Sequence, residues 1–383
     1  MVGVGESIHG IREFLGLRQR VAQFLVERMG YTAVALETGL PDAKAVYDYV
    51  LGAELAPRLW DDGFTWGMAG FGGTRELVEW MRAYNRDPAH TRKIHFYGMD
   101  ISGASGSWVP ALRQILSYLD RVEPAYASGT RERLVPILEK FARTDFTASN
   151  DAYSALPLED RNAIAALVNE LADRFDVLRL SYVAASSRDD YDWARQIAFN
   201  LRRANTMVTN YEARNRPNAV WNARDLAMSA NVRWIAEREG AAGGVVVLAH
   251  NAHVQTAASV AVPPNQVSLG IYLRDALGTG YRNIGFTFNR GAMFGRPGEE
   301  ISLDTARAAS IDGVLARVGR PMFLLDLRRV PTASAAARWL DAPRDQRIQN
   351  LYTGYNQLRS WDALIFVDSI SPSRLPSATG GTR

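Results

Sequence analysis

Short apolar runs that alternate with amphipathic stretches constrain the fold of this chain more than any other feature of its sequence. Each run is rich in β-branched residues, and glycine or a charged residue commonly bounds it. The runs are Tyr31–Glu37, Lys93–Asp100, Gly243–His250, Asn283–Phe288, Pro321–Asp326 and Ala363–Asp368. Runs of this kind are typical of buried strands, and strands that alternate with helices are typical of a parallel sheet covered on both faces. We therefore predict an α/β fold: a three-layer α/β/α core around a mostly parallel sheet.

The stretches between these runs carry apolar residues at helical spacing. In residues 11–29, one stripe of side chains repeats with the 3.6-residue period of a helix: Phe14, Leu17, Val21, Phe24 and Leu25. Between about residues 125 and 236 the strand pattern is almost absent, and long helical patterns fill roughly 110 residues. This middle region predicts a large helical insertion between two strands of one sheet.

These patterns divide the chain into four parts. Residues 1–124 are expected to form the first part of the α/β core, and residues 241–368 the second part. Residues 125–240 form the predicted insertion, which we expect to make a wall of the substrate cleft, because ligands of α/β proteins bind at the carboxyl end of the sheet. Residues 369–383 are rich in Ser, Pro, Gly and Thr and predict a disordered tail.

Composition excludes several kinds of site and partner. The 383 residues include no cysteine, which excludes disulfides, cysteine nucleophiles and thiolate metal sites. No apolar run reaches the roughly 20 residues that a membrane crossing needs, so we expect no membrane partner. The 44 Lys and Arg residues nearly balance the 41 Asp and Glu residues and form no basic stripe. We therefore expect a small-molecule substrate and no nucleic acid.

The N-terminal residues bear on localisation. They lack the basic segment followed by an apolar one that a signal peptide has, so the chain as written is expected in the cytoplasm. Val2–Gly5 resembles the end of a strand, so an incomplete N-terminus would leave an export signal unseen. The sequence is silent on oligomeric state, and a monomer is the working expectation.

Polar side chains occur at the ends of the first two predicted strands. Glu6 and His9 lie in the turn GESIHG, where a short strand meets a helix, and Glu37 ends an otherwise apolar strand. A carboxylate beside an imidazole orients the ring and raises its basicity, as a general base needs. The structural alternatives are a helix cap in the turn and an exposed strand end at Glu37.

Two later strand ends carry similar residues. His250 ends the most hydrophobic strand, and His253 follows three residues later, so both could face the same point. Asn251 lies between them and could donate a hydrogen bond to a developing oxyanion. Asp100 ends another strand, where it could orient a neighbour or cap the next turn. Two structural histidines at a helix start are the alternative for the late turn.

The same residue types leave a metal site open as an alternative. His and Glu side chains ligate zinc or manganese, and the spacing of these residues does not exclude such a site. The candidate ligands are Glu6, His9, Glu37, His250 and His253.

In order and spacing, these motifs resemble those of the erythromycin esterase family. The resemblance rests on the turn Gly5–Gly10, on Arg18 in the next helix, on Glu37 and on Ala249–His253. Arg18 follows His9 by nine residues and Glu37 follows it by twenty-eight, as in the family pattern. The likeness extends to about Phe288. The family normally carries more chain before the first turn, including a complete first strand.

The resemblance implies a hydrolase that opens an ester or a lactone without a cofactor, a metal or a covalent intermediate. Its catalytic residues would be His9, Glu6, Glu37, His250 and Arg18. His9 would be the general base and Glu6 would orient it. Glu37 and His250 would position water or protonate the leaving alkoxide, and Arg18 would hold the carboxylate geometry or stabilise charge.

The resemblance also bears on the surrounding residues and on the substrate. His253, Asn251 and Asp100 would contact the substrate or support the catalytic residues. A macrolide such as erythromycin is the candidate substrate. The family also includes members associated with succinoglycan biosynthesis, so another ester or an acylated sugar remains an alternative. A metal-dependent hydrolase and a catalytically silent ligand-binding protein are further alternatives.

Overall fold

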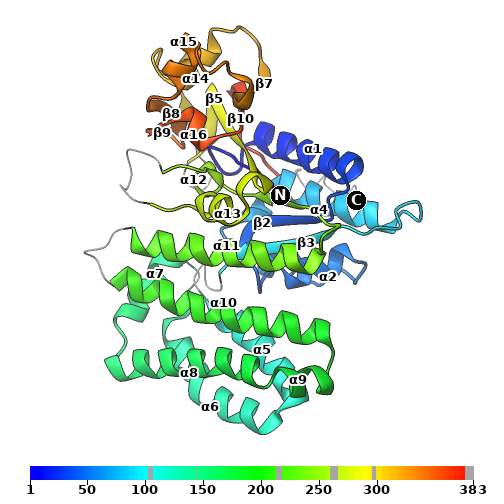
Figure 1. Cartoon of the computed structure of the whole chain (residues 1–383). Helices are drawn as coiled ribbons and strands as arrows, with labels where there is room; N and C mark the ends of the chain where they lie inside the picture. The colour runs from blue at the N-terminus through cyan, green and yellow to red at the C-terminus, as the bar shows by residue number, and fades with distance from the viewer. Residues whose placement is uncertain (102–106, 144, 213–217, 259–265, 296–298, 376–383) are drawn as a thin grey trace, which may run out of the picture.

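One mostly parallel sheet runs through the computed structural model, which describes residues 1–383 except 102–106, 144, 213–217, 259–265, 296–298 and 376–383 (Figure 1). The strand order is β3-β2-β4-β1-β5-β10-β7, and β6 pairs with β5 outside this order. The strands are β1 (Val2–Val4), β2 (Ala33–Gly39), β3 (His95–Asp100), β4 (Val245–Leu248), β5 (Arg282–Phe294), β6 (Glu300–Leu303), β7 (Met322–Asp326) and β10 (Ala363–Ile370).

The strand directions confirm the predicted α/β class. All pairings from β3 through β10 in the sheet order are parallel, whereas β7 and β6 run antiparallel to their neighbours. Each of the six apolar runs identified in the sequence overlaps a strand. The short β1 lies between β4 and β5, in the interior of the sheet, so the residues that follow it emerge at the centre of the strand ends.

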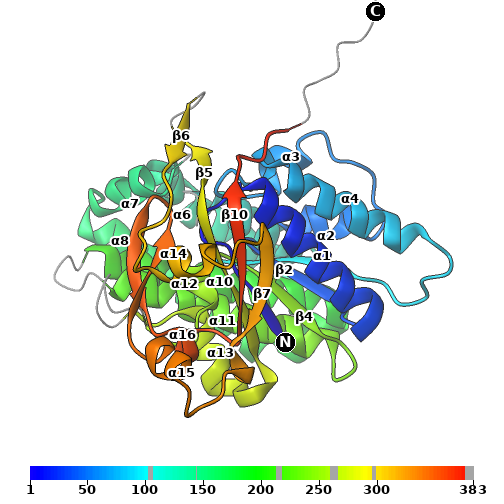
Figure 2. The same cartoon turned by 90° about the horizontal axis from the view of Figure 1, so that it is seen from above.

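Successive side chains of the central strands enter two separate cores. Ala35 of β2 and Val247 of β4 belong to one core, and Val34 and Val246 belong to the other. The first core includes helices from the middle of the chain, and the second includes α1 (Arg12–Met29) and α4 (Gly72–Arg86). Helices therefore cover both faces of the sheet, as Figures 1 and 2 show.

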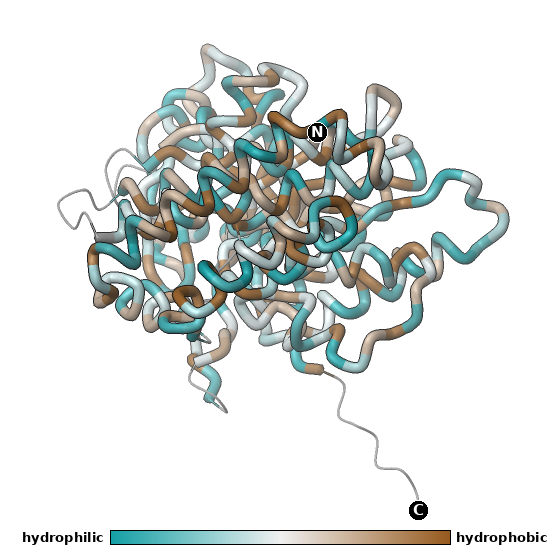
Figure 3. Tube along the Cα trace, turned by 90° about the horizontal axis from the view of Figure 1, so that it is seen from below, coloured by the Kyte–Doolittle hydropathy of each residue, from teal (hydrophilic) through white to brown (hydrophobic). Residues whose placement is uncertain are grey.

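The described residues between β3 and β4 form helices and no strand. These helices are α5 (Val109–Val122), α6 (Pro124–Phe141), α7 (Phe146–Ser154), α8 (Leu158–Val177), α9 (Arg179–Ala185), α10 (Arg188–Glu212) and α11 (Ala219–Glu239). In Figure 1, α11 lies along the sheet, and α10, α8 and α6 stack progressively farther from it. Figure 3 shows hydrophilic and hydrophobic residues alternating along the outer helices, as expected where one helix face is buried. This segment contains the predicted insertion of residues 125–240.

Shorter helices complete the chain: α2 (Lys44–Val50), α3 (Leu59–Asp62), α12 (Asn251–Val254), α13 (Leu269–Leu277), α14 (Ile311–Ala316), α15 (Ala335–Leu340) and α16 (Gln357–Ser360). A separate hairpin of β8 (Arg344–Ile348) and β9 (Leu351–Tyr355) was not predicted, because β8 contains mostly polar residues rather than an apolar run. Among the described helices, none combines the length and the apolar composition that a membrane-spanning segment needs.

The C-terminal residues differ in part from the predicted disordered tail. Ser369 and Ile370 belong to β10, so the ordered chain extends past residue 368. Backbone hydrogen bonds of 2.9 Å from Arg12 to Ser371 and 2.7 Å from Ser373 to Gly10 then fix the next residues to the N-terminal turn. The rest of the predicted tail, residues 376–383, lies outside the described residues.

A glycine in β3 makes room for an irregularity in β2. The pairing of these strands shifts register between Leu36 and Gly39, and Glu37 lies within that shift. A Cβ atom on Gly98 would lie 2.7 Å from the carbonyl oxygen of Thr38 and closer still to that of Gly39. Only glycine at residue 98 therefore allows the end of β2 to approach β3 as it does.

We expect Gly98→Ala to lower the free energy of unfolding by about 1–3 kcal/mol, because the added methyl overlaps backbone atoms that cannot rotate away. Denaturant unfolding measures the change. Gly16→Ala is the matched control, since its Cβ would have open space within an exposed helix position, and it is expected to be neutral or to stabilise by up to about 1 kcal/mol. Equal effects of the two substitutions would contradict this account.

Candidate active site

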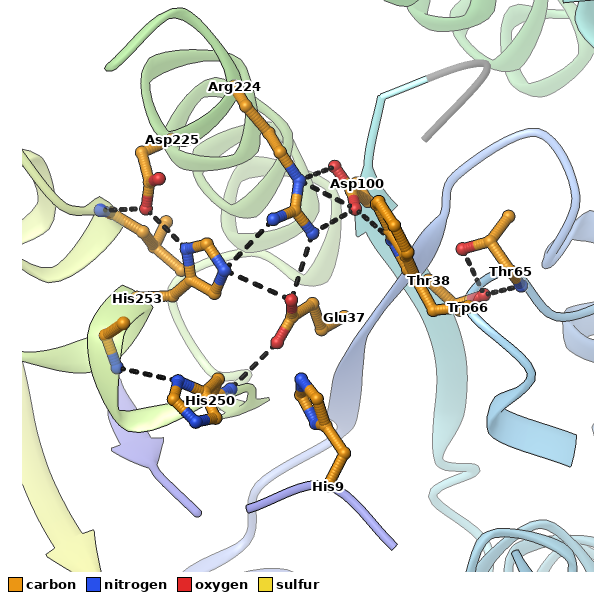
Figure 4. Close-up of polar contacts among 12 residues, drawn as sticks. His9, Glu37, Thr38, Thr65, Trp66, Asp100, Arg224, Asp225, His250 and His253 are labelled. Carbon is orange, nitrogen blue, oxygen red and sulfur yellow. Dashed lines mark hydrogen bonds and ion pairs between the residues drawn. The ribbon is translucent and has the colours of Figure 1, made fainter. Parts of the chain in front are cut away.

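Four neighbouring strands end at the same edge of the sheet and carry polar residues there. In sheet order, β3 ends at Asp100, β2 reaches Glu37, β4 is followed by His250, and β1 is followed by Glu6. Because parallel strands place their carboxyl ends together, residues far apart in sequence meet at this edge. Figure 4 shows part of the resulting cluster, in which His9 faces Glu37 and His250.

One carboxylate oxygen of Glu6 contacts both His9 and Arg18. Its Oε1 atom lies 2.8 Å from Nδ1 of His9 and 2.5 Å from Nη1 of Arg18. Glu6 and Arg18 are buried, whereas the His9 side chain is 31% exposed. When the ring is neutral, Nδ1 of His9 donates its proton to Glu6 and Nε2 carries the lone pair; no hydrogen bond from Nε2 occurs within the described part of the chain.

The surroundings set the charge of both groups. Burial opposes ionisation of Glu6, but the charge of Arg18 and the hydrogen bond with His9 outweigh it and lower the pKa of Glu6. Burial likewise opposes protonation of His9, but the hydrogen bond with Glu6 and the charges of Glu37 and Glu6 raise the pKa of His9 above its ordinary value. His9 is therefore a stronger base than a free imidazole.

Hydrogen-bonding capacity remains unused beside His9. Among the described residues, Oε2 of Glu6, Oγ of Ser7 and two guanidinium nitrogens of Arg18 are buried without a hydrogen-bond partner. Buried polar atoms are costly to leave unpaired, so this cluster of atoms is suited to contact a polar molecule.

The Asn251 side chain hydrogen-bonds with the backbone of β5. Its Nδ2 donates to the carbonyl of Phe286 at 2.7 Å, and its Oδ1 accepts from the Phe286 amide at 3.1 Å. A Cβ atom on Gly5 would overlap Oδ1 of Asn251, which explains the glycine at that position. The two hydrogen bonds with Phe286 fix the amide against β5 and use one of the two Nδ2 protons, so donation to an oxyanion stays a prediction for Asn251.

Glu37 accepts hydrogen bonds on both carboxylate oxygens. Its Oε1 lies 2.9 Å from Nη2 of Arg224 and 3.1 Å from Nε2 of His253, and its Oε2 accepts from the backbone amide of His250 at 2.8 Å. Burial raises the pKa of Glu37, but the positive charge and hydrogen bond of His253 and the charges of His9 and Arg224 lower it well below its usual range. Glu37 is therefore a fixed anion facing His9.

Arg224 of α11 joins the ends of β2 and β3. Its Nη2 lies 2.6 Å from Asp100 and its Nε lies 3.1 Å from both Asp100 oxygens, while the same Nη2 reaches Glu37. The guanidinium lies 5.0 Å from the ring centre of Trp66, whose indole donates to Asp100 at 3.0 Å. These contacts hold the last helix of the helical segment against the sheet.

His253 lies between two carboxylates. Nδ1 is 2.8 Å from Asp225 of α11, and Nε2 is 3.1 Å from Glu37. Nη1 of Arg224 also lies 3.1 Å from Nε2, and because arginine only donates, this contact is a hydrogen bond when Nε2 carries no proton. Burial lowers the pKa of His253, but the charges of Asp225 and Glu37 raise it to about 10. This pKa favours a doubly protonated ring at neutral pH, in which Nε2 faces Glu37 with a proton.

His250 has the opposite charge state. Nδ1 accepts the backbone amide proton of Ala252 at 3.2 Å, so it carries no proton, and Nε2 lies 3.1 Å from the carbonyl oxygen of Ser7, to which it donates. Burial and the nearby charges of His9 and His253 lower the pKa of His250 to about 3. His250 is therefore neutral, and both its nitrogens are engaged.

Arg224, Asp225 and Trp66 were not predicted from the sequence as residues of the site. A usable signal was present for Arg224, because it falls on the buried stripe of α11 between Val220 and Met228, where helical spacing predicts an apolar residue. Trp66 carried no such signal, since it follows α3 in irregular chain and its backbone has the uncommon positive φ of 58°. The turn between β8 and β9 was not predicted either. The backbone amide of Gln349 in this turn donates to the Ser7 carbonyl oxygen at 2.9 Å, which places the turn beside the GESIHG segment.

An aromatic cleft of about 1020 Å³ borders this cluster. Its wall includes Trp66, which contacts both Asp100 and Arg224. The other aromatic side chains come from the irregular chain near α3 and from the helical segment: Trp60, Phe64, Phe146, Tyr211 and Trp221. A larger cavity of about 1220 Å³ lies beside His95 at the opposite end of β3, away from these residues.

The donor atoms fit a hydrogen-bonded cluster better than a metal site. Across the described residues, no three His, Asp or Glu side chains are arranged to hold a metal ion. Of the three histidines, His250 and His253 have both nitrogens committed to protein partners, so only Nε2 of His9 offers a free lone pair. Metal ligation needs such lone pairs.

Comparison with known proteins gives one family over most of the chain. The sequence model described as erythromycin esterase matches residues 26–370. The chain is 21% identical to the erythromycin esterase type II of Escherichia coli, over 98% of this chain and 90% of that protein.

Three solved structures share the fold over 98% of this chain. A Bacillus cereus protein has a TM-score of 0.83 at 22% identity, and this chain covers 90% of it. A protein described as a succinoglycan biosynthesis protein has a TM-score of 0.79 at 22% identity and 89% coverage. An erythromycin esterase solved as a histidine-to-asparagine mutant in its open conformation has a TM-score of 0.78 at 18% identity and 91% coverage.

The buried neutral His250 is expected to make the protein less stable in mild acid. Its pKa of about 3 lies below the ordinary value of 6.5, so protonation favours the unfolded chain. Stability from this residue is present above pH 6.5 and is lost as the pH falls toward 3. We expect its contribution to the slope to approach about 1.4 kcal/mol per pH unit.

Denaturant unfolding between about pH 6.5 and about pH 5 tests this, because other groups contribute equally to wild type and variant in that window. His250→Gln should show a shallower loss of stability with falling pH than the wild type. Parallel slopes would contradict the assignment of a neutral His250.

Proposed function

This chain belongs to the erythromycin esterase family, and from that premise we propose that it hydrolyses an ester or a lactone by activating water with His9. The observation that carries the proposal is the pairing of Nδ1 of His9 with the buried carboxylate of Glu6, which leaves Nε2 free and the ring partly exposed. A base in this state can take a proton from water at neutral pH.

Hydrolysis by this route needs no covalent intermediate. Water attacks the ester carbonyl while Nε2 of His9 accepts its proton, and the negative charges of Glu6 and Glu37 stabilise the imidazolium that forms. Arg18 keeps Glu6 ionised, so Glu6 holds the ring and does not take the proton itself. The tetrahedral intermediate then breaks the bond to the alkoxide, which takes the proton back from His9.

The geometry favours His9 over Glu37 and His250 as the donor to the leaving alkoxide. The pKa of Glu37 is lowered well below its usual range, so Glu37 carries no proton to give. His250 donates its one proton to Ser7, and its low pKa disfavours a second one. In this proposal, Glu37 supplies charge, and His250 fixes the GESIHG turn through the Ser7 carbonyl.

The aromatic cleft supports a bulky substrate. Its volume of about 1020 Å³ is at the upper end of the range for ligand pockets, and its aromatic walls match large rings with apolar faces. Trp66 connects this cleft to the catalytic cluster. A macrolide lactone fits these requirements and is the candidate substrate.

An acylated sugar is the second candidate. Sugar rings have apolar faces that pack on aromatic side chains, and the cleft offers Trp60 and Trp221 for such contacts. One of the proteins that share this fold is described as a succinoglycan biosynthesis protein. The same hydrolytic chemistry would remove an acyl group from such a substrate.

Incubation of the purified protein with erythromycin, followed by mass spectrometry, tests the proposal. We expect the product to have gained one water. His9→Asn should lower the rate by about a hundredfold or more while leaving binding intact, because asparagine fills similar space without basicity. Activity should also survive chelation of metals.

Each result has a distinct meaning. Hydrolysis that is unchanged in His9→Asn would contradict the proposed base, and loss of activity on chelation would favour a metal-dependent mechanism. No hydrolysis of erythromycin, with turnover of acylated sugars in the same assay, would select the second candidate. Binding of these compounds without turnover of any of them would indicate a silent ligand-binding member.

The pH dependence of the rate is expected to report His9. Activity requires the neutral ring, so the rate should rise with pH through a pKa above the ordinary histidine value. Glu6→Gln removes the hydrogen bond and charge that raise this pKa, so the acidic limb of the profile should move to lower pH while the maximal rate falls. An acidic limb that stays in place would assign it to another group.

A further inference from the structure

We propose that Asp225, in the helical segment outside the sequence motifs, is a positioning residue that keeps His253 doubly protonated and thereby fixes Glu37 as an oriented anion opposite His9. The inference rests on the proposed hydrolytic function for its kinetic consequence. The charge and orientation of these groups follow from the contacts of three successive side chains, Asp225, His253 and Glu37.

The contacts form a continuous chain from α11 to the end of β2. Oδ1 of Asp225 lies 2.8 Å from Nδ1 of His253, and Nε2 of His253 lies 3.1 Å from Oε1 of Glu37 (Figure 4). Asp225 has no exposed surface, and Oδ1 also accepts the backbone amide of Leu269 at 2.7 Å. Asp225 and Glu37 flank the ring, so a ring with protons on both nitrogens can donate to both carboxylates, whereas an unprotonated Nε2 would accept from Nη1 of Arg224, 3.1 Å away.

The charge of His253 depends on Asp225. Burial and the neighbouring cation Arg224 both disfavour a protonated ring, and Glu37 is already shared with Arg224. The charge of Asp225 is the largest influence in the opposite direction. His250 and Tyr272 of α13 also lie nearby, but His250 is neutral and the pKa of Tyr272 is raised by burial and by Asp225, so neither adds a cation that could replace His253.

Loss of the proton on His253 would change Glu37 directly. A neutral ring that keeps its proton on Nδ1 has a lone pair on Nε2, which can accept from Nη1 of Arg224 but no longer attracts Oε1 of Glu37. Glu37 would then be held on that oxygen by Arg224 alone, and its position relative to His9 would no longer be fixed. Because Glu37 raises the pKa of His9, a substitution of Asp225 would change the pKa of His9 through His253 and Glu37.

Histidine NMR on the Asp225→Asn variant tests the charge assignment without any substrate. With five histidines in the chain, the side-chain nitrogens can be assigned individually. In the wild type, His253 should remain doubly protonated until the pH nears about 10. In Asp225→Asn it should titrate at a lower pH. A wild-type ring that is neutral at neutral pH, or one unaffected by the substitution, would overturn the proposal.

Kinetics then test the role in turnover. With erythromycin, or with the acylated sugar if that is the substrate, Asp225→Asn should lower kcat by about tenfold or more at alkaline pH, with a smaller loss at acidic pH and little change in KM. The alkaline limb should move to lower pH. His253→Gln should remove the alkaline limb. The double variant with Asp225→Asn should have nearly the same kcat as His253→Gln alone, because Asp225 acts through His253.

Matched variants separate this role from folding and from net charge. Asp275→Asn removes an exposed carboxylate on α13 and is expected to leave the pH profile unchanged. A uniform loss of kcat for Asp225→Asn at every pH would indicate a structural role and overturn the proposal. Absence of turnover in the wild type would remove the proposed function, while the NMR result would still decide whether Asp225 sets the charge of His253.

Discussion

The buried guanidinium of Arg224 is the contact on which the rest of this site depends. It pairs with Asp100 and Glu37 at the ends of two adjacent strands, and it reaches them from a helix that the sequence places more than 120 residues later. Removing one partner of a buried ion pair is costly, so the three groups must be present together. The sheet, the helical segment and the catalytic edge are therefore joined by one charged group.

The three histidines at this edge differ in basicity, and their surroundings explain each difference. His9 shares a proton with Glu6 and is a strengthened base, His253 lies between two carboxylates that raise its pKa, and His250 lies between a backbone amide and a carbonyl and is neutral. Identical side chains thus perform different tasks because their hydrogen-bond partners differ. Only the first has a free nitrogen, which is why we assign the proton transfers to it.

Strand ends were readable from the sequence because two signals coincide there. An apolar run that stops at a charged residue, as at Glu37 and Asp100, indicates both a buried strand and a polar edge. The class of fold and the residues at the strand ends followed from this pattern. Contacts between distant helices and the sheet did not follow: nothing local in Asp225 or Trp66 tells which strand each will meet. The pairing of Asn251 with Phe286 was likewise hidden, since an asparagine beside histidines gives no sign of its backbone partner.

The division of labour along the helical segment has a consequence for how such proteins diversify. Phe146 and Tyr211 line only the cleft, so their part of the segment can change with the compound that is recognised. Helix α11 carries Trp221 on the cleft and, one turn later, Arg224 and Asp225 in the charged cluster. Recombination that exchanged the whole segment would therefore replace part of the proposed catalytic apparatus, whereas an exchange that ended before α11 would leave Arg224 and Asp225 in place. The tolerated crossover points in descendants of this gene should fall before that helix.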